Sequence, residues 1–82
     1  MRRDDLVVVR IGKKGITEGI ISEIDNVLEK RGMVKIKLLR NFREAYGVNR
    51  NDVAIMLSER LNACIEEVRG FTIILRRQKF KK

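Results

Sequence analysis

The 82-residue chain contains no histidine and only one cysteine, Cys64, so an internal disulfide and a Cys/His zinc site are both excluded. Its apolar runs are far shorter than the roughly 20 residues that span a bilayer, and residues 1–5 lack the features of a signal peptide. We therefore expect a cytoplasmic protein with no membrane contact, and we expect Cys64 to be a small core residue. Aromatic residues are scarce, at three phenylalanines and one tyrosine, which leaves little with which to stack single-stranded bases.

Positive charge is what the chain has in excess, with a net charge of +8 and an isoelectric point near 10.3. The charge is sorted along the chain: residues 1–17, 33–50 and 71–82 carry +3, +4 and +5, whereas 18–32 and 51–70 carry −2 each. The two negative blocks hold the two main predicted helices. We therefore expect one positive side and one neutral-to-acidic side, which is typical of a protein that binds a polyanion.

A basic loop at residues 12–15, Gly-Lys-Lys-Gly, stands between a β-branched run at 6–11 and an amphipathic segment at 17–31. A glycine at each end lets the backbone turn sharply and approach a partner closely. Lys13 and Lys14 add charge beside the unpaired N–H groups of a helix N-terminus, where an anion is already favoured. We expect this loop to bind an anion such as a phosphate backbone. The alternative is a solvated turn.

Periodicity predicts the remaining elements. They are a helix over 17–31 capped by Thr17 and Gly32, a strand over 33–38, a helix from about Asn49, a strand over 65–68, a turn at 69–70 and a strand over 71–76. Residues 41–48 have helical spacing interrupted by Gly47, which predicts a helical turn or an irregular link. The order βαβαββ predicts an α/β two-layer domain over residues 1–77, with two main helices on one face of a four-stranded mixed sheet. Residues 78–82 form a basic tail.

Alternation in the strands and spacing in the second main helix predict which side chains face the core. That helix is expected to bury Val53, Met56, Leu57 and Leu61. The uncovered face of the sheet is expected to show Val8, Arg10, Lys35, Lys37, Ile74 and Arg76. Its cations, together with Arg77, are candidates for binding RNA, and ordinary solvated strand residues are the alternative.

Three stretches of the sequence resemble the signatures of the CRM domain, the family of the bacterial YhbY-type ribosome-associated proteins and the plant organelle intron-splicing factors. They are Val9-Arg10-Ile11-Gly12-Lys13-Lys14-Gly15-Ile16-Thr17-Glu18-Gly19, residues 28–38, and Gly70-Phe71-Thr72-Ile73-Ile74-Leu75-Arg76-Arg77. The resemblance runs from about Val7 to Arg77. It departs at Leu75-Arg76-Arg77, where many members have Leu-Tyr-Arg, and in residues 39–51, which match no signature. Bacterial members also have a helix before the first strand, for which residues 1–5 leave no room.

The resemblance implies a fold like the C-terminal domain of bacterial translation initiation factor three, with strand order 1-2-4-3. It also implies that the glycine loop acts like the phosphate-clamping loop of KH domains. Gly12, Lys13, Lys14 and Gly15 would then contact RNA backbone. The implied partner is structured RNA, such as ribosomal RNA or ribosomal subunit precursors, during ribosome assembly or RNA maturation.

No residue set suggests catalysis or a cofactor. Asp4-Asp5 and Glu66-Glu67 are adjacent carboxylates, and neighbours on a strand point to opposite faces, so neither pair converges on a metal or a substrate. Tyr46 is expected to pack beside Phe42, and Phe80 in the basic tail is the better candidate for base stacking. We therefore expect a non-enzymatic RNA-binding domain. The alternatives are a protein-interaction module that docks on an acidic partner and a sequence-neutral chromatin protein that prefers duplex DNA.

Overall fold

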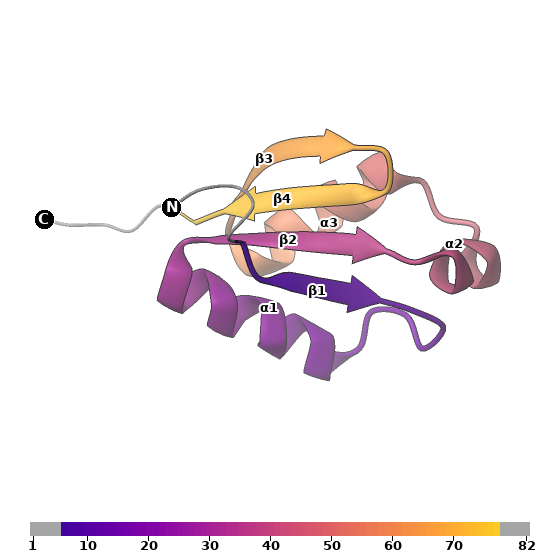
Figure 1. The fold of residues 1–82 in the computed structure, drawn as a ribbon, viewed down its shortest axis with the longest axis horizontal. Helices are drawn as coiled ribbons and strands as arrows, with labels where there is room; N and C mark the ends of the chain where they lie inside the picture. The colour runs from indigo at the N-terminus through magenta and orange to yellow at the C-terminus, as the bar shows by residue number, and fades with distance from the viewer. Residues whose placement is uncertain (1–5, 78–82) are drawn as a thin grey trace, which may run out of the picture.

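A computed structural model describes residues 6–77 of the chain. Its elements are β1 (Val8–Ile11), α1 (Glu18–Arg31), β2 (Met33–Leu38), α2 (Arg40–Tyr46), α3 (Arg50–Leu61), β3 (Cys64–Arg69) and β4 (Thr72–Arg76). The strands form one sheet in the order β1-β2-β4-β3, in which β1 and β2 are parallel and β4 is antiparallel to both neighbours. Helices α1 and α3 cover one face, and α2 lies where β1 and β2 end (Figure 1). This confirms the predicted two-layer α/β fold and its strand order.

Helix α1 begins and ends at the predicted residues because both caps form. The side-chain oxygen of Thr17 accepts a hydrogen bond from the N–H of Ile20 at 3.2 Å. At the other end Gly32 adopts a left-handed conformation, with φ at +82°, and its N–H donates to the carbonyl of Leu28 at 2.9 Å. The helix buries Ile24 and Leu28 completely and contacts β1 and β2.

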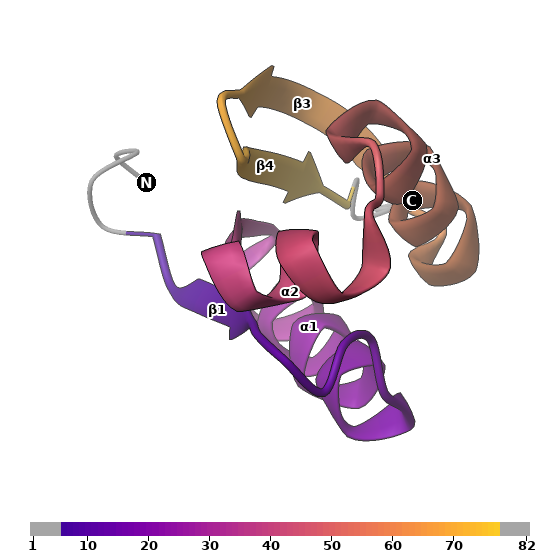
Figure 2. The same cartoon turned by 90° about the vertical axis from the view of Figure 1, so that its right-hand side faces the viewer.

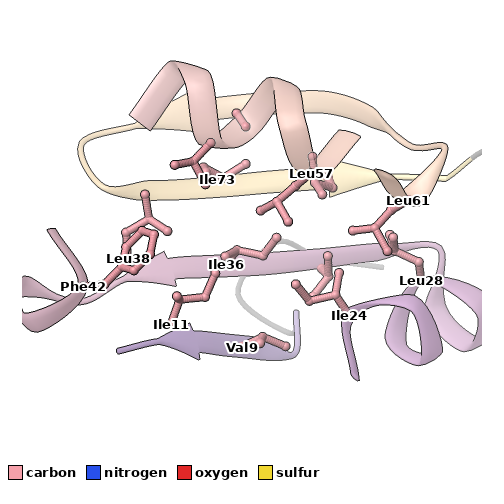
Figure 3. Packing of buried hydrophobic residues seen from close by; sticks show 14 residues of the cluster. Val9, Ile11, Ile24, Leu28, Ile36, Leu38, Phe42, Leu57, Leu61 and Ile73 are labelled. Carbon is pink, nitrogen blue, oxygen red and sulfur yellow. The ribbon is translucent and has the colours of Figure 1, made fainter. Parts of the chain in front are cut away.

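One apolar cluster joins the covered face of the sheet to the helices (Figure 3). Its members are Val9, Ile11, Ile24, Leu28, Val34, Ile36, Leu38, Phe42, Val53, Ala54, Leu57, Leu61, Ile73 and Leu75. The predicted burial of Val53, Leu57 and Leu61 is confirmed, because their spacing of four residues keeps them on one side of α3. The predicted burial of Met56 is wrong, since it lies beside that stripe and is 37% exposed. None of the helices in residues 6–77 is long and apolar enough to cross a membrane.

Strand β3 differs from the prediction at its first residue and inside its ladder. Cys64 begins the strand and pairs with Arg76, which places it on the uncovered face, so the prediction of a core cysteine is wrong. The register shifts between Ile65 and Glu67, so that Glu66 is an extra residue in this edge strand. The turn to β4 lies at residues 70–71, one residue later than predicted.

The segment expected to be a helical turn or an irregular link forms helix α2 and connects β2 to α3. Phe42 anchors it in the core at 3% exposure, and Arg40 and Glu44 form an ion pair one turn apart at 2.9 Å. Gly47 ends the helix in the left-handed region, with φ at +57°. Helix α2 therefore comprises seven residues, Arg40–Tyr46, and ends before Gly47.

Arg77, which directly follows β4, connects the C-terminal ends of α1 and α3. Its Nη2 donates to Oδ1 of Asp25 at 2.7 Å and to the carbonyl of Leu61 at 2.5 Å, and its Nη1 donates to Oε1 of Glu29 at 3.2 Å. Its backbone N–H donates to the carbonyl of Gly32 at 3.0 Å. The side chain is only 19% exposed, so it holds both helix ends against the end of the sheet.

Replacing Arg77 with alanine should lower the free energy of unfolding by about 1–3 kcal/mol, because a partly buried set of charge-assisted hydrogen bonds is lost. Urea denaturation measures this change. The matched control is Arg76→Ala, which removes the guanidinium of the preceding residue. That guanidinium forms an exposed ion pair with Glu66, so its loss should change stability little. Equal losses in the two variants would contradict the role of Arg77.

Candidate nucleic-acid interface

The loop after β1 is a tight turn with two lysines at its tip. The N–H of Gly15 donates to the carbonyl of Gly12 at 2.9 Å, which closes a four-residue turn. Gly15 has φ at +77°, a conformation that glycine adopts without strain. Lys13 and Lys14 are exposed and form no ion pair within residues 6–77. The turn thus presents to solvent two lysine side chains whose charges no residue of 6–77 neutralises.

Helix α2 supports this loop through Tyr46. The hydroxyl of Tyr46 donates to the carbonyl of Lys14 at 3.3 Å, and its ring lies 5.3 Å from the ring of Phe42, centroid to centroid. The tyrosine ring also occupies the space beside Gly15, where a Cβ atom would lie 2.8 Å from the hydroxyl oxygen. The expected contact with Phe42 is confirmed, although Tyr46 is 52% exposed. Sequence reasoning missed its role in shaping the loop.

A shallow hollow of about 530 Å³ lies between the loop and the first turn of α1. Its lining consists of Gly12, Lys13, Lys14, Gly15, Thr17, Gly19, Ile20 and Glu23. The first turn of a helix presents N–H groups without intrahelical partners, so the hollow combines a positive dipole end with two lysines. Two carboxylates lie near it, of which Glu18 is bound by Arg60 at 3.0 Å while Glu23 lines the hollow.

The uncovered face of the sheet brings three more predicted cations together. Arg10 on β1 lies opposite Lys37 on β2, and Val8 lies opposite Lys35, which in turn pairs with Ile74 on β4. Within residues 6–77 Arg10, Lys35 and Lys37 form no ion pair. Ile74 shares the face but is only 5% exposed, so it adds little to the accessible surface. The positive charge is therefore concentrated on β1 and β2.

The last two predicted cations behave differently from these three. Arg76 lies on the uncovered face, but its Nε donates to Oε1 of Glu66 at 2.8 Å, and this hydrogen bond raises the pKa of Arg76 above its ordinary value. Arg77 points to the opposite side, toward Asp25 and Glu29, so placing it with the other cations was wrong. The reason is the alternation of side chains, which sends consecutive residues to opposite faces.

The acidic residues of the described chain do not assemble into a metal site. Residues 6–77 contain no group of three or more His, Cys, Asp or Glu side chains that could hold a metal ion. Asp4 and Asp5, as well as the stacking candidate Phe80 and the rest of the basic tail, lie outside the described residues.

The two glycines of the loop should respond differently to alanine. Gly15→Ala should lower the free energy of unfolding by about 1–2 kcal/mol, because it combines a left-handed conformation with a clash against Tyr46. Gly12→Ala is the matched control, because its Cβ atom would lie 3.6 Å from Cδ1 of Leu39, an ordinary contact, and its φ is not positive. Thermal unfolding followed by circular dichroism compares them. A stable Gly15→Ala variant would contradict the support by Tyr46.

Known proteins resemble this chain in sequence and in fold. A family model for the CRS1/YhbY (CRM) domain matches residues 4–77. The Probable RNA-binding protein YqeI of Bacillus subtilis is 31% identical over 68 residues, which is 83% of this chain and 67% of that protein. The solution structure of the hypothetical protein SAV1595 from Staphylococcus aureus, a candidate RNA-binding protein, has a TM-score of 0.66 at 32% identity, covering 89% of this chain and 72% of that one. Because each match extends over most of the chain, this protein belongs to the CRS1/YhbY (CRM) domain family.

Proposed function

We propose that this protein binds structured RNA without catalysis, through the loop at residues 12–15 and the adjacent basic surface formed by Arg10, Lys35 and Lys37. The observation that carries the proposal is the pair of exposed lysines, without an ion pair in the described part of the chain, at the tip of a turn that leads into the N-terminus of α1. The names of the Bacillus subtilis and Staphylococcus aureus relatives, both of which mention RNA binding, support it.

Phosphate is the ligand that suits the geometry of the loop. Gly15 closes the turn in a left-handed conformation with Tyr46 beside it, which leaves the side chains of Lys13 and Lys14 exposed at the tip. Lys13 and Lys14 supply charge, and the first turn of α1, which lines the same hollow, adds the positive end of the helix dipole. Contacts of this kind position a protein on RNA without reading its sequence.

The biological role that we propose is ribosome assembly or RNA maturation in the cytoplasm. A ribosomal RNA or a ribosomal subunit precursor would supply the folded backbone that such a surface binds. The net charge of +8 favours association with such a polyanion. We propose no cofactor and no chemical step.

Lys13→Gln/Lys14→Gln should greatly weaken RNA binding while leaving the fold intact, because both side chains are exposed at the turn and the glycines are retained. Each lysine that neutralises a phosphate contributes roughly 0.7–0.9 to the slope of log affinity against log salt, so the slope should flatten by about 1.5. The measurement is binding of a stem–loop RNA at several salt concentrations, with circular dichroism to verify folding.

The matched control for this test is Lys30→Gln/Arg31→Gln. It removes the same charge from two exposed cations in the last turn of α1, at the end of the helix far from the loop (Figure 1). It should reduce affinity much less. Equal affinity and equal slope for the loop variant and the control would show that net charge, and not the loop, drives binding.

We also expect structured RNA to compete better than homopolymer single strands or duplex DNA at physiological salt. Within residues 6–77 the aromatic side chains are already engaged, because Phe42 is buried, Tyr46 supports the loop and Phe71 lies under Arg43. Tyr46 and Phe71 are half exposed, but these contacts hold their rings in place and leave only part of each ring for stacking on unpaired bases. Competition binding with the three nucleic acids measures the order. A preference for duplex DNA would favour a chromatin protein instead.

A further inference from the structure

Two arginines share one aromatic ring at the edge of the molecule where the basic loop lies. The ring belongs to Phe71, in the turn between β3 and β4, and Phe71 is 41% exposed. Cζ of Arg43 on α2 lies 3.9 Å from the ring centroid, and Cζ of Arg50, the first residue of α3, lies 5.8 Å from it. Three elements that are distant in the sequence therefore meet in this group, which we call the Phe71 cluster.

The charges of the Phe71 cluster have no counter-charge among residues 6–77. Neither Arg43 nor Arg50 forms an ion pair within residues 6–77, and Nε of Arg43 is buried without a hydrogen-bond partner. Other arginines of the described chain do bind carboxylates, namely Arg40, Arg60, Arg69, Arg76 and Arg77. Two like charges on one ring repel each other, and this repulsion is relieved when an anion binds between them.

The Phe71 cluster is continuous with the loop through helix α2. Arg43 and Tyr46 lie three residues apart, so their side chains are neighbours on the surface of this helix. Tyr46 reaches the carbonyl of Lys14 while Arg43 reaches Phe71. Figure 2 shows α2 between the loop that follows β1 and the turn that joins β3 to β4.

We propose that Arg43 and Arg50 bind a second phosphate of the same RNA backbone that contacts the loop, and that Phe71 is the positioning residue that holds them. This inference rests on the proposed RNA-binding function. A guanidinium stacked on a ring can still donate from its two Nη groups, and these match two phosphate oxygens, whereas Nε of Arg43 is buried. The face of Phe71 under Arg43 is occupied, so the cluster binds backbone and not a stacked base.

The test compares four variants for binding of one stem–loop RNA across a salt series. Arg43→Gln/Arg50→Gln should lower affinity about tenfold and flatten the salt slope by about 1, as expected for one lost phosphate contact. Lys30→Gln/Arg31→Gln, with the same net charge, should bind almost as wild type. Arg43→Lys/Arg50→Lys keeps both positive charges but replaces each planar guanidinium with an ammonium group. It should therefore lower the affinity for the RNA while retaining most of the slope of log affinity against log salt.

Phe71→Leu leaves every charge in place and tests the positioning role. It should reduce both affinity and slope, because the two guanidinium groups are no longer held together, whereas circular dichroism should show a folded protein. If Arg43→Gln/Arg50→Gln does not fold, the lysine variant and Phe71→Leu decide the question, and wild-type affinity in both overturns the inference.

The outcomes separate this inference from the proposed function. If the Gln variant of the cluster matches the Lys30→Gln/Arg31→Gln control while Lys13→Gln/Lys14→Gln loses binding, the cluster is not a phosphate site and the loop still binds RNA. If wild type does not bind the RNA at any salt concentration, the proposed function and this inference are both wrong.

Discussion

The parallel pairing of β1 with β2 determines where the basic loop and its neighbours lie. Parallel strands end at the same edge of a sheet, so the loop at residues 12–15 and helix α2 begin side by side. The N–H of Leu39, just after β2, donates to the carbonyl of Ile11 at 3.0 Å across that edge. Strand β4 runs antiparallel to β2 and starts there too, with the carbonyl of Phe71 2.8 Å from the N–H of Leu38. One edge therefore collects the loop, α2 and the Phe71 cluster.

The cations of this small domain divide into two groups with different physical roles. Arg77 and Arg76 bind carboxylates of their own chain, so their charges are largely compensated. The cations of the loop, of β1 and β2 and of the Phe71 cluster have no such partner within residues 6–77, namely Lys13, Lys14, Arg10, Lys35, Lys37, Arg43 and Arg50. Uncompensated charge raises the self-repulsion of the folded protein and favours a polyanionic partner. The positive surface of the folded domain therefore depends on which of its cations form ion pairs as well as on where the cations stand in the sequence.

The sequence by itself determined the features that depend on neighbouring residues. Thr17 and Gly32 mark the ends of α1 because caps act within one turn of a helix. Alternation in Met33–Leu38 separated Lys35 and Lys37 from the core because side chains of a strand alternate between two faces. The Gly-Lys-Lys-Gly turn followed from four consecutive residues, and the resemblance to the CRM domain supplied the strand order.

Only the tertiary structure decided the features that depend on residues far apart in the sequence. Arg77 looked like a surface cation, but its role depends on Asp25, Glu29 and Leu61, which no local pattern connects to it. The support that Tyr46 gives to the loop joins residues 32 positions apart. Helix α2 is short, and its amphipathic pattern is interrupted by Gly47, so propensity alone could not establish its length. These features arise from packing between elements, which periodicity in one segment does not encode.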